Sequence, residues 1–194
     1  MNDTAALVKQ LRNTVIPGVC IDLVPLNETH FARVTALRNR PEVGRYLNQT
    51  APLTVDDQRR WYEETYLPSD DDLYYAIVTK DGRMAGTIRL NDITSRSLAQ
   101  SSFIMDADMA GEGPYTAETE YLTLCLAFDT LGVDYVINEP RTDNKPMNRL
   151  AKKMGFTVEK VIEKDGHALN WCTLTPDRFP RETLRELLAY WAAR

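Results

Sequence analysis

A glycine-bearing turn between a strand and a helix constrains the fold of this chain more than any other feature. A β-rich run over residues 98–105 leads to a turn at residues 110–114 that holds Gly111 and Gly113, and helical periodicity follows over residues 115–131. Such a junction presents free backbone N–H groups beside the positive end of the helix dipole, and glycine lets an anion approach those amides closely. The pattern therefore predicts a phosphate-binding turn, although an ordinary strand-to-helix connection has the same sequence.

The run before this turn extends a predicted antiparallel sheet. Residues 73–79 and 84–90 are rich in β-forming side chains and are joined by a turn that contains Asp81-Gly82. The Asp-Gly pair supplies the positive φ angles of a tight hairpin, and residues 98–105 add the next strand. We therefore expect an α/β (α+β) domain built on a mixed, mostly antiparallel, twisted sheet.

The elements after the turn complete this sheet and cover it with helices. Residues 133–138 are a strand, Asp143 caps the next helix, and that helix ends at Met154 with Gly155 as its C-terminal cap. The other predicted elements are a helix over residues 4–12 capped by Asn2 or Asp3, a strand over 19–25, a helix over 29–39 capped by Asn27 or Thr29 and stopped by Pro41, a helical segment over 42–47, a helix opened by a Thr54–Asp57 capping box, strands over 156–163 and 168–174, and a closing helix with the stripe Leu184, Leu187, Leu188 and Trp191. That stripe is expected to dock on the domain or on a second copy in a homodimer.

Length and composition indicate one domain over residues 1–194. The chain is long enough to bury a continuous core, and it has no linker, repeat or low-complexity tract. No apolar run approaches the roughly 20 residues of a membrane span, and the amino terminus lacks the basic start and apolar core typical of a signal peptide. We therefore expect a cytoplasmic protein without a membrane partner. The net charge is −5 and the basic residues are scattered, which argues against nucleic acid. Cys20, Cys125 and Cys172 stand alone, so no metal site is expected.

A second motif lies downstream of the glycine turn. Residues 144–156 follow a strand at short range, open on an Asn at a helix start and close on a Gly-Phe pair. The two motifs together resemble the GNAT superfamily of N-acetyltransferases, in which a strand, a phosphate turn, a helix and a strand precede such a helix. Residues 37–39, 42–47 and 54–61 resemble the early helices of the ribosomal-protein N-terminal acetyltransferase and amino-sugar N-acetyltransferase branches. The resemblance covers residues 19–176 and implies a GNAT-like sheet flanked by helices, with the terminal helices as additions.

The resemblance implies a cosubstrate, acetyl-CoA or another acyl-CoA. The family's splayed strand end matches residues 103–105, whose backbone groups pair with the pantetheine amides, and its pyrophosphate turn matches residues 111–116. Asn144 matches the helix-opening asparagine near the cofactor arm. The cofactor-binding residues implied in this way are Phe103, Met105, Gly111, Gly113, Pro114, Tyr115, Thr116, Asn144 and Met147.

The chemistry that the resemblance implies is direct attack of an unprotonated amine on the thioester, while a strand N–H polarises the carbonyl oxygen. The acceptor is expected to be a primary amine of a small molecule, an amino sugar or a peptide terminus. Glu139 is the first candidate for the base, followed by Asp106 and Asp92, although each carboxylate also fits a solvated surface position. The residues expected at the acceptor are Arg38, Asn39, Trp61 and Trp171, with Tyr62 and His167 near them.

Several positions depart from the family pattern. Ala110 and Tyr115 replace the usual start and end of the turn, and Glu112 replaces a frequent basic residue. A carboxylate beside a pyrophosphate repels it, so Glu112 must point away from a bound cofactor. Ala151 stands where many members carry a tyrosine that protonates the leaving thiolate. The alternative function is therefore a degenerate domain of the same fold that binds a ligand without catalysis. A Rossmann site is disfavoured, because Thr116 replaces its third glycine and the preceding strands look antiparallel.

Overall fold

The computed structural model describes residues 4–47, 49 and 51–194, and within these residues its centre is one eight-stranded sheet. The strands are β1 (Ile16–Pro17), β2 (Ile21–Pro25), β3 (Leu73–Thr79), β4 (Met84–Asn91), β5 (Ser97–Met105), β6 (Tyr135–Asn138), β7 (Thr157–Lys164) and β8 (His167–Leu174). Their order is β1-β2-β3-β4-β5-β6-β8-β7, and every described neighbour pair is antiparallel except β5 with β6. The predicted mixed, mostly antiparallel sheet is confirmed.

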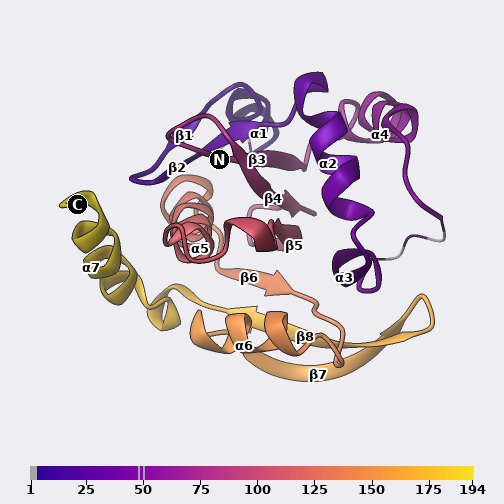
Figure 1. The fold of residues 1–194 in the computed structure, drawn as a ribbon. Helices are drawn as coiled ribbons and strands as arrows, with labels where there is room; N and C mark the ends of the chain where they lie inside the picture. Colours follow the sequence, from indigo (N-terminus) through magenta and orange to yellow (C-terminus); the bar gives the residue numbers. More distant parts are fainter. Residues whose placement is uncertain (1–3, 48, 50) are drawn as a thin grey trace.

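Helices cover both faces of this sheet. They are α1 (Thr4–Leu11), α2 (Phe31–Arg38), α3 (Pro41–Gly44), α4 (Val55–Trp61), α5 (Tyr115–Cys125), α6 (Lys145–Lys153) and α7 (Arg181–Ala192), with 3-10 turns at Glu28–His30, Ala107–Met109 and Pro176–Arg178 and π-helical turns at Tyr62–Tyr66 and Leu126–Leu131. Figure 1 shows α5 and α2 on opposite sides of β4 and β5. Val8 of α1 and Leu124 of α5 belong to the main core cluster, whereas Phe31 of α2 packs with Tyr74 in a second cluster.

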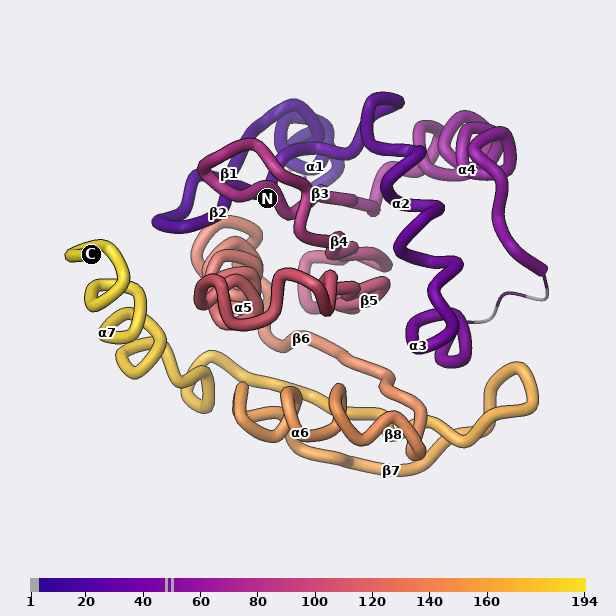
Figure 2. Tube along the Cα trace, viewed as in Figure 1, coloured from indigo at the N-terminus to yellow at the C-terminus, as the bar shows by residue number. Residues whose placement is uncertain are grey.

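β5 runs beside β6 for only part of its length. The parallel register pairs Ser97 with Tyr135 and Gln100 with Asn138, where β6 ends. β5 continues to Met105 with β4 as its only described strand partner, and the traces of β5 and β6 separate in Figure 2. The second half of β5 therefore presents an unpaired edge on the side of β6.

The backbone of β5 changes direction at Ser102. This residue has a φ of 46°, in the left-handed region, and the β4–β5 register shifts between Thr87 and Arg89. Thr87 Oγ1 donates a hydrogen bond to the Ser102 carbonyl at 2.9 Å. A bulge of this kind bends a strand and redirects its side chains, which places Ser102 at the point where β5 has left β6.

The β3–β4 and β7–β8 hairpins both close at Asp-Gly turns, but the two turns differ. Asp165 and Gly166 have φ angles of 52° and 73°, the positive values of a two-residue hairpin turn. In the β3–β4 loop only Gly82 has a positive φ, 85°, and Asp81 does not. The prediction that Asp81 supplies a positive φ is wrong, because the longer loop over residues 80–83 needs that conformation only at the glycine.

The cap of α6 is one residue later than predicted. Asn144 is the N-cap, since its side chain accepts a hydrogen bond from the Met147 N–H at 3.3 Å. Asp143 instead pairs with Arg141 at 2.8 Å, which engages its carboxylate outside the helix. The prediction of Asp143 as the cap is therefore wrong, whereas Gly155 ends the helix with a φ of 91°, as predicted.

Two predicted caps of the early helices, at Asn27 and Thr54, are present in the structure. The Asn27 side chain accepts a hydrogen bond from the Thr29 N–H and opens a 3-10 turn that continues into α2. The pair Thr54–Asp57 forms the predicted reciprocal capping box of α4. Pro41 lies in the first turn of α3, where its missing N–H costs nothing. Residues 2 and 3, the predicted caps of α1, lie outside the described residues.

The closing helix α7 docks on the domain through part of its predicted stripe. Leu184 and Leu188 are buried, whereas Leu187 remains 38% exposed. Arg181 at the start of α7 pairs with Asp129 at 2.6 Å, beside the end of α5. In the described part of the chain, no helix is both long enough and apolar enough to cross a membrane.

Candidate active site

The glycine turn connects the end of β5 to the first turn of α5. Gly111 has a φ of 89°, a conformation that favours glycine. A Cβ added to Gly113 would lie 2.5 Å from the Tyr115 ring, so this position has no room for a side chain. Tyr115 and Thr116 occupy the first turn of α5, whose N-cap Pro114 makes no side-chain cap bond. The first amides of α5 are therefore open to an anion beside the turn.

Glu112 in this turn forms an ion pair with Arg83 of the β3–β4 loop. Its Oε2 accepts a hydrogen bond from Arg83 Nη2 at 2.7 Å. Arg83 lies in the β3–β4 loop and also contacts Asp81 at 2.7 Å. The contact directs the Glu112 carboxylate toward that loop and compensates its charge, although solvent screens a pair that is partly exposed.

The strand end before the turn carries two of the predicted cofactor residues. Phe103 and Met105 are half-buried and pack against the main core cluster. Their backbone lies in the part of β5 that extends beyond β6. The N–H and C=O groups along this edge can therefore pair with an extended ligand in the way that another strand would.

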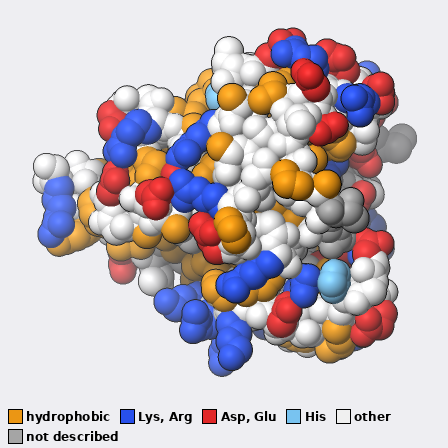
Figure 3. All heavy atoms as spheres, turned by 45° about the vertical axis from the view of Figure 1, so that its right-hand side comes forward, with side chains coloured by type: hydrophobic (Ala, Val, Ile, Leu, Met, Phe, Trp, Pro, Cys, Tyr) orange, Lys and Arg blue, Asp and Glu red, His pale blue; other side chains and the backbone are white. Residues whose placement is uncertain are grey.

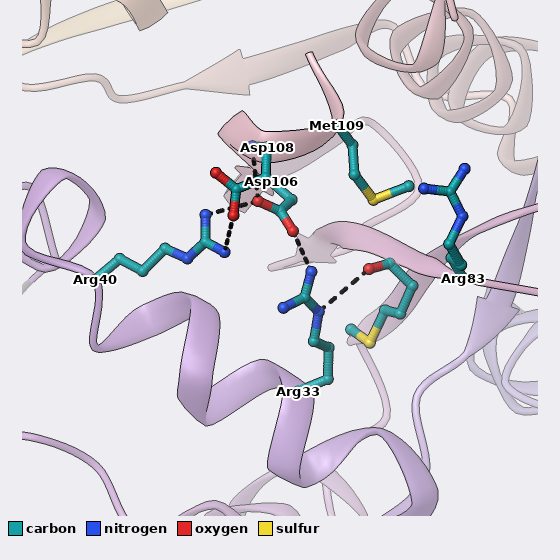
Figure 4. A pocket seen from close by; sticks show the side chains of 7 residues that line it. Arg33, Arg40, Arg83, Asp106, Asp108 and Met109 are labelled. Carbon is teal, nitrogen blue, oxygen red and sulfur yellow. Dashed lines mark hydrogen bonds and ion pairs between the residues drawn. The ribbon is translucent and has the colours of Figure 1, made fainter. Parts of the chain in front are cut away.

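Asp106 follows β5 directly and is buried between two arginines. Its side chain is 2% exposed and contacts Arg33 and, at 2.6 Å, Arg40. Figure 4 shows both guanidinium groups converging on it from the side of α2. Burial raises the pKa of Asp106, but the Asp108 N–H and the two arginines outweigh burial and hold this pKa below its ordinary value. Such a carboxylate is a weak base, so its contacts argue for a structural role.

A cavity of about 410 Å³ adjoins these ion pairs. It is lined by Arg33, Arg40, Arg83, Met84, Asp106, Asp108 and Met109. The acidic and basic side chains in it are largely paired with one another. We therefore assign it to the framework that holds the end of β5 and the glycine turn in place.

Glu139 lies just beyond the end of β6. Its Oε2 accepts a hydrogen bond from Lys164 Nζ at 3.0 Å, and its side chain is 27% exposed. Asp92, the third carboxylate considered, is exposed and accepts a hydrogen bond from Asn91 Nδ2 at 2.7 Å. No group of His, Cys, Asp and Glu side chains in the described part of the chain could hold a metal ion.

A second cavity, of about 190 Å³, lies between α2, α4 and the strands β3 to β5. It is lined by Arg38, Leu53, Asp57, Gln58, Trp61, Tyr74, Arg89 and Ser102. Two predicted acceptor residues, Arg38 and Trp61, come together here, next to the bulged residue Ser102. Acidic and basic side chains are mixed over this side of the molecule (Figure 3), so recognition depends on individual side chains.

Asn39 and Trp171, the other two predicted acceptor residues, do not line this cavity. The Asn39 side chain accepts from the Leu53 N–H and donates to the Leu53 carbonyl, both at 2.8 Å. Asn39 thus positions a residue that lines the cavity. Trp171 lies on β8, outside the described lining, with Lys160 Nζ at 5.1 Å from its ring centre. Two of the four predicted residues therefore line this cavity, Asn39 adjoins it through Leu53, and Trp171 lies apart.

Tyr62 and His167 also lie outside the described lining. Tyr62 packs edge-on against the Phe31 ring, with 5.1 Å between ring centres. His167 at the start of β8 lies 3.3 Å from Arg141, measured from Nε2 to Nη1. Tyr62 therefore packs against the second core cluster, and His167 contacts the loop that precedes α6.

Six of the eight lining residues were not predicted as site residues, among them Gln58, Arg89 and Tyr74. Gln58 precedes Trp61 by one helical turn, a spacing that puts both on one face of α4. Arg89 is the charged residue of β4, where it contacts Asp72 at 2.9 Å and lies 5.1 Å from the Trp61 ring centre. Burial raises the pKa of Asp72, and Arg89 offsets only part of this effect. No sequence pattern marked Tyr74 as a site residue, because an aromatic residue in a β-rich run is typical of a core.

The start of α6 holds the remaining predicted cofactor residues. Asn144 uses its side-chain oxygen to cap the helix, and Met147 in the first turn is half-buried. Ala151, one helical turn further on, is 4% exposed in the main core cluster. This helix therefore offers no proton donor at the position of Ala151.

Several solved structures have a similar fold. A GCN5-related N-acetyltransferase from Brucella melitensis is 22% identical, with 91% of this chain and 86% of that chain covered and a TM-score of 0.76. A nucleotide-linked sugar GNAT in its apo form is 18% identical over 91% and 99% of the two chains, with a TM-score of 0.72. A spermidine N-acetyltransferase from Vibrio cholerae in complex with CoA and spermine is 14% identical over 79% and 94%, with a TM-score of 0.68.

These similarities, at low identity, establish a shared fold. A comparison with curated proteins found no significant match. The family model for the acetyltransferase (GNAT) domain, in contrast, matches residues 21–157, which include the second half of β5, the glycine turn, α5, β6 and α6. This chain therefore belongs to the GNAT acetyltransferase family.

Proposed function

We propose that the protein, as a single domain, transfers an acetyl or other acyl group from acyl-CoA to a primary amine by direct attack. The observation that carries this proposal is the separation of β5 from β6 after Gln100, in the part of β5 that leads to the glycine turn. The free edge at residues 103–105 supports pairing with the pantetheine amides, and the amides at residues 111–116 support binding of the pyrophosphate. Asn144 and Met147 at the start of α6 are proposed to lie along the cofactor arm.

The amine is proposed to approach from the face of α2 and α4. The 190 Å³ cavity on that face reaches Ser102, so an amine held there meets β5 from the side opposite α5. We assign Arg38, Asn39 and Trp61 to the acceptor, with Trp171 at its periphery. The nucleotide-linked sugar and spermidine enzymes among the structural neighbours support an amine acceptor without identifying it.

In the proposed reaction, the amine lone pair attacks the thioester carbonyl carbon, the C–S bond breaks, and the thiolate takes a proton from water. Glu139 is proposed to accept the proton that the amine releases, through water. Asp106 is the second candidate, but its two arginine partners favour a role in holding the end of β5. A strand N–H at residues 103–105 is proposed to polarise the carbonyl oxygen.

Thiol release from acetyl-CoA with a panel of primary amines tests this proposal. Glu139→Gln should lower kcat/KM by about a hundredfold, the usual contribution of a general base. Glu163→Gln is the matched control, since Glu163 is an exposed carboxylate on β7. An unchanged rate for Glu139→Gln would remove this residue from the mechanism. A protein that acetyl-CoA stabilises against heat but that releases no thiol with any amine would be a binding domain, the alternative function.

A further inference from the structure

Three buried polar atoms without a hydrogen-bond partner line the smaller cavity. They are Arg38 Nε, Gln58 Nε2 and Tyr74 Oη, which make up half of the six such side-chain atoms found among the described residues. Gln58 and Tyr74 are only 5% and 3% exposed. A buried polar group without a partner destabilises a fold and is therefore rare in native proteins. Three of them in one cavity indicate a ligand that supplies their partners.

The other charged groups of this cavity are already engaged. Arg89 Nε donates to Asp72 at 2.9 Å. Asp57 accepts from the Thr54 hydroxyl at 2.6 Å and from the Thr54 N–H at 3.0 Å. No ion pair joins Arg38 to another described residue. The Arg38 guanidinium is therefore the charge that a ligand in this cavity would meet.

The three unpartnered atoms have the same hydrogen-bonding character. A guanidinium Nε–H and an amide nitrogen only donate, and a phenol hydroxyl can donate as well. Their complement is a group rich in acceptor oxygens, and the charge of Arg38 favours an anion. A planar carboxylate suits a guanidinium, because its two oxygens accept hydrogen bonds in one plane. A volume of about 190 Å³ fits such a group together with a few carbon atoms.

We propose that this cavity binds a carboxylate of the acyl acceptor, so that the acceptor class is a small molecule with both a primary amine and a carboxylate. This inference rests on the proposed function and names the acceptor. The carboxylate lies against Arg38, Gln58 and Tyr74. Ser102 lies in the same cavity on β5, and the amine extends from the carboxylate toward it and toward the thioester.

Matched acceptors test this assignment. Amino acids are compared with their carboxamides and with the corresponding decarboxylated amines, and aminomethylphosphonate is compared with glycine. We expect kcat/KM to be at least tenfold higher for the carboxylates, and Arg38→Gln and Tyr74→Phe each to lower this ratio about tenfold. Calorimetric titration of the preferred amino acid into CoA-bound protein should show the same weakening of Kd. A ratio that neither variant changes would overturn the proposal, as would a preference for the phosphonate.

Tyr75→Phe provides a matched control on the same strand. The Tyr75 hydroxyl donates to the Leu11 carbonyl at 3.2 Å, on the opposite face of β3. Its removal should lower Tm and leave the carboxylate preference unchanged. Tyr74→Phe should keep or raise Tm, because it removes a hydroxyl that has no partner. A clear loss of Tm in Tyr74→Phe would show that this hydroxyl is satisfied in the free protein, and would count against the site.

The same acceptor panel separates failure of this inference from failure of the proposed function. If carboxamides and decarboxylated amines react as well as amino acids do, the transferase stands and the carboxylate site is wrong. If no amine of any class reacts, although acetyl-CoA raises Tm, the proposed function fails and the acceptor assignment fails with it.

Discussion

Arg83 Nη2 lies 2.7 Å from Glu112 Oε2, so an ion pair ties the β3–β4 loop to the glycine turn. The pair resolves a difficulty that the sequence poses, because a carboxylate stands in a turn that is proposed to hold a pyrophosphate. Arg83 brings a positive charge to this turn from a segment far away in the sequence. The charge balance at the proposed phosphate site therefore depends on a tertiary contact.

Replacing Arg83 should weaken cofactor binding. In Arg83→Gln the Glu112 carboxylate is uncompensated, and two like charges about 4 Å apart repel by about 4 kcal/mol at an effective dielectric near 20, before screening. Both side chains are partly exposed, so we expect a smaller effect, about a tenfold rise in the Kd of acetyl-CoA. Isothermal titration at low and at high salt measures it, and the rise should shrink at high salt.

The double variant Arg83→Gln with Glu112→Gln should regain most of the lost affinity, since the repelling charge is gone. Arg96→Gln is the control, because Arg96 pairs with Asp134 at 3.0 Å and both side chains are exposed. An Arg83→Gln protein that binds acetyl-CoA as tightly as the wild type would show that Glu112 does not face the phosphates.

Asp106→Asn should destabilise the fold at neutral pH. Loss of the carboxylate leaves Arg33 and Arg40 without their buried partner, and breaking a buried pair typically costs about 3 to 5 kcal/mol. The arginines keep some contact with water, so we expect a loss of about 2 kcal/mol in the free energy of unfolding at pH 7. Urea unfolding measures this loss. A stable Asp106→Asn protein without turnover would instead assign Asp106 to catalysis.

The effect of Asp106 should depend on pH in a defined direction. The folded pKa of this carboxyl lies below its ordinary value of 3.8. Its stabilisation is therefore fully present above about pH 4 and is lost as the pH falls through the folded pKa. The difference in unfolding free energy between the wild type and Asp106→Asn should accordingly shrink in acid.

Glu120→Gln should stabilise the protein, more so as the pH rises. Glu120 on α5 is 1% exposed and accepts a hydrogen bond from Gln100 Nε2 at 2.9 Å. Burial raises its pKa from 4.5 to about 7, although the Gln100 bond lowers it. The wild type thus loses stability as the pH rises from about 4.5 to 7 and then levels off. The advantage of Glu120→Gln should grow by about 2 to 3 kcal/mol between pH 4 and pH 8.

Urea unfolding across this pH range is the measurement for Glu120, with the exposed Glu163→Gln as control. The control should show no such trend, because a solvated carboxyl titrates alike in the folded and unfolded chains. A constant difference between the wild type and Glu120→Gln at all pH values would mean that Glu120 is not buried in its neutral form.

Alanine at the two adjacent polar residues before α6 should have unequal effects. Asn144→Ala removes the side chain that caps the Met147 N–H and should cost about 1 kcal/mol. Asp143→Ala removes only an ion pair with Arg141 and should cost clearly less, since the carboxylate is largely exposed and solvent screens the pair. Thermal unfolding of both variants compares them. Equal losses would contradict the assigned cap.

Local signals predicted much of the fold, because they depend on neighbours a few residues apart. The capping box at Thr54–Asp57 and the left-handed Gly155 after α6 appear where the pattern placed them. The error at Asp143 has the same origin, since two adjacent side chains were both able to cap α6. Arg141 binds the Asp143 carboxylate outside the helix, so Asn144 is the residue that caps α6.

The sequence by itself determined the order of strands and helices and the position of the glycine turn, because periodicity, caps and turn glycines act locally. Only the tertiary structure decided which side chains meet. Arg83 reaches Glu112 across 29 positions of sequence, and Arg38, Gln58 and Tyr74 come from three elements to one cavity. Residue types alone do not show that three polar atoms will be buried there without partners. That depends on how α2 and α4 pack on β3, and it is this packing that creates the proposed acceptor site.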